Sequence, residues 1–300
     1  MVPDDAIAVV HVDLARLRAS KHYGHIAPLL ERASAENPAM SRVLAASSEA
    51  LFAIHSHSTA KHDTTGALLL RGKFTDKDLA DFHAERAKRE GDPSSATPFE
   101  DGGVRGWAWK DGTRSYLLGD HTWVTVDETW FARLNLAAMH PDGKEPLEAV
   151  RQGFPYGGHV ADFAADVEAL DRSTLDAARE QAVGPLRDVA ETKRLVGYVE
   201  LGSDLDANIR FEMRDAATAT HLAKEVVNAR DLYGRNLVIR AMGFADAIAG
   251  ISATSDGSSA TLRLQLKQAT VSMLFDRLSQ ILARFAEHVG AQMGTSGDGT

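Results

Sequence analysis

Apolar and polar residues alternate in short stretches along this chain, and the stretches recur in the same order. Residues 6–17 (AIAVVHVDLARL) and 159–170 (HVADFAADVEAL) each have the pattern of a strand whose aspartate, Asp13 or Asp166, stands just before a helical pattern. An aspartate there can accept hydrogen bonds from the unpaired N–H groups of the first helical turn. Both stretches therefore predict a strand followed by a helix, and the first helix is expected to continue through Leu30.

Each of these units is followed by a predicted hairpin and a second helix. The hairpins are expected from two alternating apolar stretches around a polar turn, and the helices begin beside acidic residues. The hairpin stretches are 51–58 with 66–74, and 195–203 with 207–213; the helices are 75–90 and 214–234. The order of elements thus repeats along the chain.

A last hairpin and helix complete each half, at residues 115–134 and 251–278. Between the two hairpins, the first half contains an added strand at 103–113, and the second half a helical pattern at 236–250. Each half therefore reads β-α-ββ-α-ββ-α. Hairpins grouped with helices favour the α+β class, with a mainly antiparallel sheet covered by helices on one face.

A stretch rich in Pro and Gly at 139–158 separates the two halves. We predict a first α+β repeat at 1–140, a linker at 141–157 and a second α+β repeat at 158–290. The end of the chain, 291–300, is dominated by Gly, Ser and Thr and is expected to be disordered. The pattern leaves open whether the two sheets pair through their edges or stack through their helices.

Composition narrows the classes of function. The 300 residues are 44% hydrophobic and carry a formal charge of −9 with scattered Lys and Arg, which argues against nucleic acid and anionic membranes as partners. No apolar run is long enough to span a membrane. The chain has no cysteine, which excludes disulfides and thiolate chemistry and suits an oxidising compartment. We expect an extracytoplasmic, for example periplasmic, protein whose export signal or lipid anchor lay before residue 1; a cytoplasmic location is the alternative.

Three histidines, His55, His57 and His62, form the densest cluster of potential metal ligands in the sequence. On a strand, His55 and His57 point to the same face about 7 Å apart, and His62 could reach back from the turn. Such a set could hold Zn²⁺. The favoured interpretation is a hairpin without cofactor, because the second copy has Val199 and Leu201 at the corresponding positions.

Aromatic residues gather on neighbouring predicted strands. Trp107 and Trp109 alternate on one strand, while Tyr116 and Trp123 lie on the next two. They could form a concave surface that binds an apolar ligand or a sugar. Large aromatic residues more often fill a core beneath helices, which is the competing interpretation.

The C-terminal helical pattern carries an apolar stripe from Val271 to Val289. Such stripes usually face the protein's own core. A helix that projects beyond its own half would instead present the stripe to a second copy or to another partner, so the sequence leaves dimer formation open.

At residues 2–20 (VPDDAIAVVHVDLARLRAS) and 262–278 (LRLQLKQATVSMLFDRL), the chain resembles exported bacterial proteins and lipoproteins of unknown function. The resemblance implies a duplicated strand-helix-hairpin fold and an extracytoplasmic location, and it transfers no catalytic motif. We predict a non-catalytic binding or structural protein that engages a protein partner or an apolar ligand through its sheets. The alternative is a metal-dependent hydrolytic enzyme that uses His55 and His57.

Overall fold

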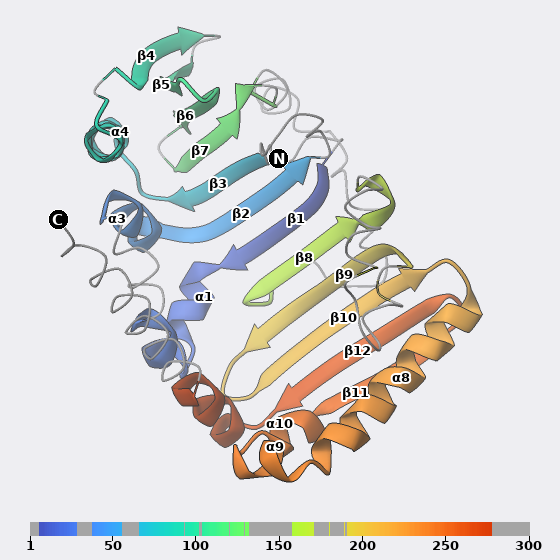
Figure 1. The fold of residues 1–300 in the computed structure, drawn as a ribbon. Coiled ribbons are helices and arrows are strands. Elements are labelled where there is room, and N and C mark those ends of the chain that lie inside the picture. The colour runs from blue at the N-terminus through green and yellow to red at the C-terminus, as the bar shows by residue number, and fades with distance from the viewer. Residues whose placement is uncertain are drawn as a thin grey trace, which may run out of the picture.

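The computed structural model describes residues 6–28, 38–55, 66–92, 94–101, 104–119, 121–128, 130–131, 158–170, 180, 189 and 191–277. Its centre is one large antiparallel sheet with helices packed against it, which confirms the α+β class (Figure 1). The predicted linker and the predicted disordered tail lie outside the described residues. Among the described helices, none is both long and apolar enough to cross a bilayer.

Twelve strands of the described chain form the sheet, in the order β11-β12-β10-β9-β8-β1-β2-β3-β7-β6-β5-β4. The strands are β1 (Ala6–Asp13), β2 (Ser47–His55), β3 (Gly66–Gly72), β4 (Ala96–Asp101), β5 (Val104–Trp109), β6 (Thr113–Leu118), β7 (Thr122–Asp127), β8 (Ala161–Asp166), β9 (Thr192–Leu201), β10 (Leu205–Met213), β11 (Ile251–Asp256) and β12 (Ser259–Leu266). The two sheets expected from the sequence are therefore joined edge to edge.

Helical segments accompany the strands. They are α1 (Leu14–Ala19), α3 (Pro38–Ala46), α4 (Asp76–Glu90), the 3₁₀ turn η1 (Val167–Ala169), α8 (Ala216–Gly234), α9 (Leu237–Ala241) and α10 (Ala245–Ala249). The expectation of one helix from residue 14 through Leu30 is wrong, because α1 ends at Ala19 and helical turns resume only at residue 23. The N-cap prediction is confirmed at Asp13, whose Oδ1 accepts a hydrogen bond from Arg16 N at 2.7 Å. It is wrong at Asp166, whose side chain accepts no capping hydrogen bond from the turn η1.

The join is the antiparallel pair of β1 and β8, the first strands of the two predicted halves. Val10 lies opposite Phe163, and these positions are 153 residues apart (163 − 10), the same spacing as Asp13 and Asp166 (166 − 13). The antiparallel pairing is therefore centred on one pair of equivalent positions of the sequence repeat, Val10 and Phe163. Outward from this pair, β2, β3, β7 and β6 on one side have the same order as β9, β10, β12 and β11 on the other.

The first half extends further than the second. The added strand expected at 103–113 is β5, but β4, which pairs with β5 and forms the end of the sheet, was not predicted. The expected helical pattern at 236–250 is present as the short helices α9 and α10. That the two sides of the sheet derive from one repeated sequence unit stays a prediction.

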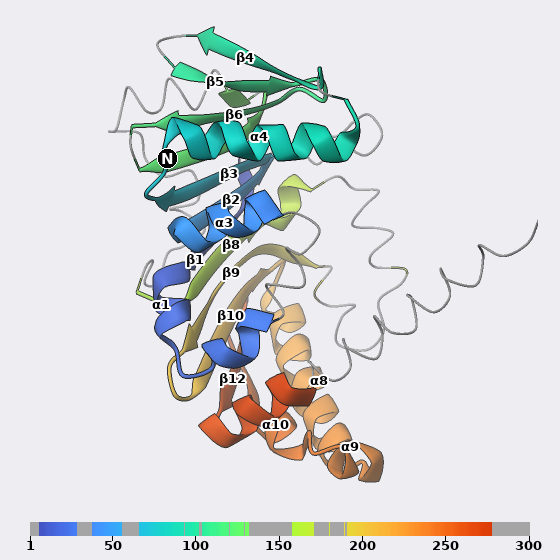
Figure 2. The same cartoon turned by 90° about the vertical axis from the view of Figure 1, so that its left-hand side faces the viewer.

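Alternate side chains divide the sheet into an apolar face and a mixed face. On the apolar face, α3 and α4 cover a cluster around Leu70, Phe82 and Trp123, and α8 covers a second cluster around Phe211 and Leu222 (Figure 2). On the opposite face, Trp130 and Phe131 pack on Tyr116 and its neighbours. Helices on one face were predicted; this further layer over the first half was not.

The outermost strands show how an open sheet of this size limits unwanted pairing. Lys110 N donates a hydrogen bond to Ser95 O at 3.0 Å. Hydrogen-bonded and non-hydrogen-bonded residue pairs alternate along an antiparallel ladder, so the backbone N–H and C=O groups of Ala96, Pro98 and Glu100 point away from β5. Pro98 has no N–H to offer there. At the other edge, α8 packs beside β11, and Arg230 donates a hydrogen bond to Ile251 O at 3.3 Å. At both edges, therefore, some of the backbone N–H and C=O groups that could pair with another strand are missing or already bonded.

A glycine on β9 gives a direct test of how closely this strand packs against β8, one of the two strands of the join. Gly197 lies opposite Phe163, and a Cβ at this position would stand 2.4 Å from the Phe163 ring and 2.5 Å from Asn208 O. We expect Gly197→Ala to lower the free energy of unfolding by about 2 kcal/mol, because neither the ring nor the backbone can move aside without strain.

Gly202→Ala is the matched control, since nothing lies within 4 Å of a Cβ at that exposed position. We expect its unfolding free energy to stay within about 0.5 kcal/mol of the wild type in a urea titration. Equal effects of the two substitutions would contradict the close approach of Phe163 to β9.

Candidate functional site

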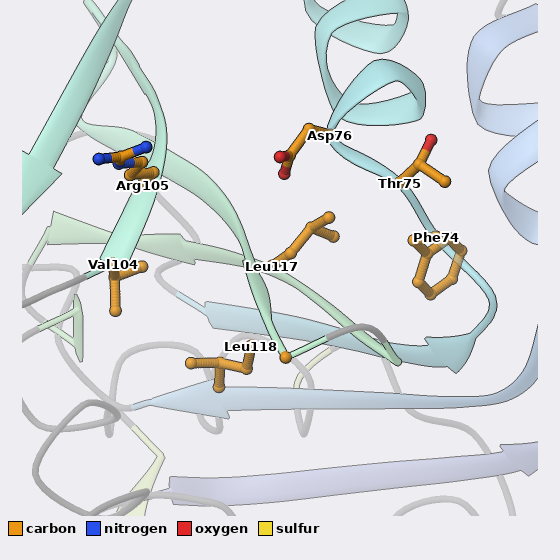
Figure 3. A pocket seen from close by; sticks show the side chains of 8 residues that line it. Phe74, Thr75, Asp76, Val104, Arg105, Leu117 and Leu118 are labelled. Atoms are coloured by element: carbon orange, nitrogen blue, oxygen red, sulfur yellow. The ribbon is translucent and has the colours of Figure 1, made fainter.

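A groove lies between the start of α4 and the strands β4 to β6. One part, with a cavity volume of about 690 Å³, is lined by Phe74, Thr75, Asp76, Val104, Arg105, Leu117, Leu118 and Gly119 (Figure 3). The adjoining part, of about 500 Å³, is lined by Asp76, Leu79, Pro98, Phe99, Glu100, Arg105, Gly106 and Trp107. The two parts share Asp76 and Arg105, and we call them together the α4 groove. Its size is that of a small-ligand site.

The first turn of α4 is fixed by a capping box, which holds one wall of the groove in place. Thr75 caps the helix, and Asp78 Oδ2 accepts hydrogen bonds from Thr75 N at 2.8 Å and from Thr75 Oγ1 at 2.6 Å. These bonds favour the ionised carboxyl and lower the pKa of Asp78. Asp76, the first helical residue, is thereby held at the mouth of the groove.

The groove combines an apolar floor with a charged rim. Leu117 and Trp107 come from neighbouring strands of the apolar face, and both pack against the cluster beneath α4. On the rim, Arg105 Nε forms an exposed ion pair with Glu100 Oε2 at 3.2 Å. Asp76 has neither a hydrogen bond nor an ion pair with any residue in the part of the chain that the structure describes. The groove can therefore accept an apolar group and attract a cationic one.

The four aromatic residues predicted as a ligand surface are divided between the two faces of the sheet. Trp107, Trp109 and Trp123 lie on the face covered by α4, whereas Tyr116 lies on the other face, in contact with Phe131. Trp109, Tyr116 and Trp123 are buried. Trp107 alone among the four lines the α4 groove. A role of these rings in ligand binding stays a prediction.

A buried histidine lies beside the groove, between α4 and the sheet. The His83 ring, on α4, stacks on Trp107 with a centroid distance of 5.3 Å and lies 5.1 Å from Trp109. Neither of its ring nitrogens has a hydrogen-bond partner among the described residues. Burial lowers the pKa of His83 to about 3, and the charge of Arg86, whose guanidinium lies over Trp109, acts in the same direction. The ring is therefore neutral at pH 7.

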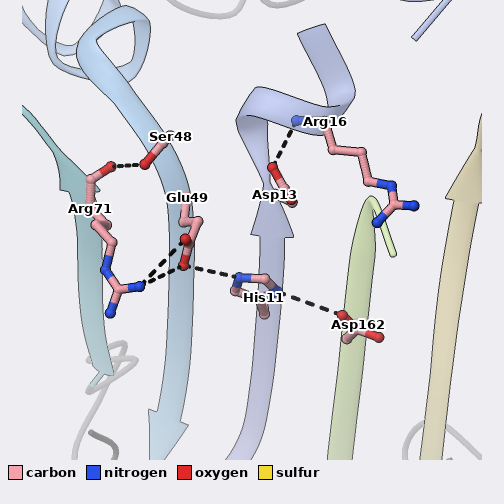
Figure 4. Close-up of polar contacts among 7 residues, drawn as sticks. All are labelled: His11, Asp13, Arg16, Ser48, Glu49, Arg71 and Asp162. Atoms are coloured by element: carbon pink, nitrogen blue, oxygen red, sulfur yellow. Dashed lines mark hydrogen bonds and ion pairs between the residues drawn. The ribbon is translucent and has the colours of Figure 1, made fainter. Parts of the chain in front are cut away.

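A polar cluster occupies the opposite face of the sheet, across the join of the two halves (Figure 4). Asp162 on β8 is buried, with Oδ1 2.8 Å from His159 Nδ1 and Oδ2 3.6 Å from His11 Nδ1. His11 on β1 also faces Glu49 on β2, with Nε2 3.6 Å from Oε2, and Glu49 forms an ion pair with Arg71 at 3.4 Å. The cluster thus links four adjacent strands, from β8 to β3, by polar side-chain contacts.

This cluster was not found in the sequence, because its central pair, His11 and Asp162, is 151 residues apart (162 − 11). The stacking of His159 on Tyr198, with a centroid distance of 4.1 Å, extends it to β9. Among the described residues, no group of three or more His, Asp or Glu has an arrangement that could hold a metal ion. We therefore interpret the cluster as a polar clamp across the join.

The predicted metal ligands fall largely outside the described part of the chain. The backbone of His55 ends β2, and His57 and His62 belong to the segment 56–65, which the structure does not describe. The zinc site predicted from these three histidines stays a prediction.

The chain matches no protein-family model and no curated protein. Among solved structures, it is similar to crystal form IV of TP0453, with a TM-score of 0.50 and 8% sequence identity over 91% of this chain and 93% of that one. Crystal form I of the same protein gives a TM-score of 0.49 and 7% identity over 90% and 93% of the two chains. At this level of identity, the likeness shows the fold alone.

Replacement of His83 tests its burial. We expect His83→Phe to raise the free energy of unfolding at pH 7 by about 1 kcal/mol, because the ring nitrogens without partners are removed. Between about pH 6.5 and pH 3 the wild-type histidine is protonated only in the unfolded chain, which lowers the stability of the wild type as the pH falls. The difference in unfolding free energy between variant and wild type should therefore be larger at pH 4.5 than at pH 7, by up to about 2–3 kcal/mol. Urea titrations of both proteins at the two pH values measure this difference; a gain independent of pH would contradict it.

Removal of the central carboxylate tests the clamp. We expect Asp162→Ala to lower the free energy of unfolding by about 3 kcal/mol, because His11 and His159 then lose a buried partner. Asp206→Ala is the control: it breaks a more exposed ion pair with Arg263 on the same sheet face and should cost less than about 1 kcal/mol. Equal costs in urea unfolding would show that the join does not depend on Asp162.

Proposed function

We propose that this protein is a non-catalytic, extracytoplasmic binding protein that takes an apolar segment of a partner, or an apolar ligand, into the α4 groove. The observation that carries the proposal is the combination of an apolar floor, Leu117 and Trp107, with a carboxylate at the mouth, Asp76, that pairs with no described residue. Binding sites commonly combine a largely apolar wall with a few charged groups that orient the ligand.

The arrangement of the described histidines gives little support to a catalytic function. His11 on β1 and His159, just before β8, both contact Asp162 on β8, away from the groove. His83 is buried under Trp107 and neutral at pH 7. A hydrolytic enzyme built on His55 and His57 stays the alternative, and no contact in the described residues favours it.

The extracytoplasmic location is part of the proposal. It is supported by the absence of cysteine from the 300 residues, which suits an oxidising compartment. Fractionation of the source cells, with an antibody against the chain, tests the location. Recovery with cytoplasmic markers would contradict this part of the proposal and would not affect the proposed binding role of the groove.

A neutral apolar dye tests the groove directly. We expect Nile red to bind the wild type and quench Trp107 fluorescence, because the dye would contact the indole that lines the groove. Leu117→Gln should weaken the binding at least 10-fold, since it places an amide in the apolar floor. Fluorescence titration gives both affinities.

Ile251→Gln is the matched control, because it introduces the same polar group at a half-buried position of β11, at the other end of the sheet. Its dye affinity should equal that of the wild type. Equal affinities of all three proteins would show that the dye binds elsewhere and would contradict the proposed role of the groove.

A further inference from the structure

The end of the molecule formed by α8 and α9 carries a concentration of exposed apolar side chains. Seven large hydrophobic residues are exposed in the described part of the chain, and five of them lie between residues 232 and 242. They are Leu232, Tyr233, Leu237, Val238 and Met242, with Leu237 80% and Val238 67% exposed. We call these five residues the α8–α9 tip. A concentration of this kind marks an interaction surface rather than the ordinary scatter of apolar groups.

Two arginines lie among the residues of the α8–α9 tip, although the protein as a whole is acidic. Arg235 and Arg240 are exposed beside the apolar residues, and neither forms an ion pair or a side-chain hydrogen bond with any residue that the structure describes. The chain as a whole has a formal charge of −9. The surface that receives the tip should therefore be apolar and carry carboxylates.

The α4 groove has this chemistry. Its floor is apolar, and its rim carries Asp76, which pairs with no described residue, and Glu100, which is exposed beside Arg105. Apolar side chains of the tip would fill the floor, and its arginines would meet the rim carboxylates. Charge and hydrophobicity are thus complementary between two surfaces of the same chain.

The two surfaces lie at opposite ends of the molecule, so one chain cannot join them to each other. Both views place α4 and β4 at one end, and α9 and α10 at the other (Figures 1 and 2). In the sheet, β4 is the last strand on one side, and β11, which packs beside α8, is the last on the other. A contact between the tip and the groove must therefore involve two molecules.

We propose that copies of this chain associate head to tail, with the α8–α9 tip of one copy seated in the α4 groove of the next. The inference rests on the proposed binding function, because it names the occupant of the groove. A contact between two different surfaces leaves one tip and one groove open at the ends of each dimer, so the assembly grows with concentration unless it closes into a ring.

Analytical ultracentrifugation of the full chain tests the association, over protein concentrations from about 1 µM to about 1 mM. The weight-average mass of the wild type should rise with concentration beyond that of a dimer. Two variants, one altered in the tip (Leu237→Asp with Val238→Asp) and one altered in the groove (Asp76→Asn with Leu117→Gln), should each stay monomeric. Lys224→Asp, an exposed charge change on α8 away from the tip, should associate like the wild type.

A mixture of the two variants gives the sharpest readout. The tip variant keeps an intact groove and the groove variant keeps an intact tip, so an equimolar mixture should form a 1:1 dimer and nothing larger. Circular dichroism of each variant checks that the fold is kept. A mixture that stays monomeric while the wild type associates would overturn the head-to-tail arrangement.

Other outcomes separate this inference from the binding function itself. A wild type that stays monomeric at every concentration, while Nile red still binds the groove, overturns the association and leaves the binding function standing; loss of both overturns both. Sedimentation of the monomer with phosphatidylglycerol vesicles, abolished in the tip variant, would assign the tip to a lipid surface and overturn its assignment to a second copy.

Discussion

The architecture depends on the backbone ladder between β1 and β8. Without that ladder, the twelve strands would separate into sheets of seven and five, each with a newly exposed central edge. Three features lie in this ladder or directly beside it. They are the opposed positions of Val10 and Phe163, the close fit of Phe163 over Gly197 on the next strand, β9, and the buried Asp162 with a histidine on either side. Apolar packing on one face and polar contacts on the other thus both act at the join. Because the join makes one long sheet, it also sets the distance between the two ends of the molecule.

Local patterns in the sequence were sufficient for elements whose side chains alternate between clearly apolar and polar positions. The hairpins of β2 with β3 and of β9 with β10, and the helices α4 and α8, were predicted close to their observed bounds for this reason. The strand β4 was missed, because Pro98 and the acidic residues Glu100 and Asp101 have the composition of a turn, and only pairing with β5 holds them extended. The break of the first helix after Ala19 was also missed, since its apolar spacing continues to Leu30.

The candidate sites were less predictable than the fold. The α4 groove draws Asp76 from a helix, Arg105 and Trp107 from one strand and Leu117 from another, so only Trp107 had been singled out from the sequence. The polar clamp joins residues whose proximity follows from the β1–β8 register, which local periodicity does not contain. The exposed residues of the α8–α9 tip resemble core positions in the sequence, and only the arrangement of α8 and α9 shows that they face solvent. In each case, the site depends on tertiary contacts that local sequence patterns do not contain.

The β1–β8 ladder also has a consequence for biosynthesis. β1 and its partner β8 are about 150 residues apart in the chain, so one side of β1 stays unpaired until β8 has also been made. During that interval, at a ribosomal rate of about 5–20 residues per second, the exposed backbone of β1 is open to pairing with other nascent chains for roughly ten to thirty seconds. The mature edges are guarded by Pro98 and Arg230, but this temporary edge has no such guard among the described contacts. A chaperone that holds extended strands would act at this stage of synthesis.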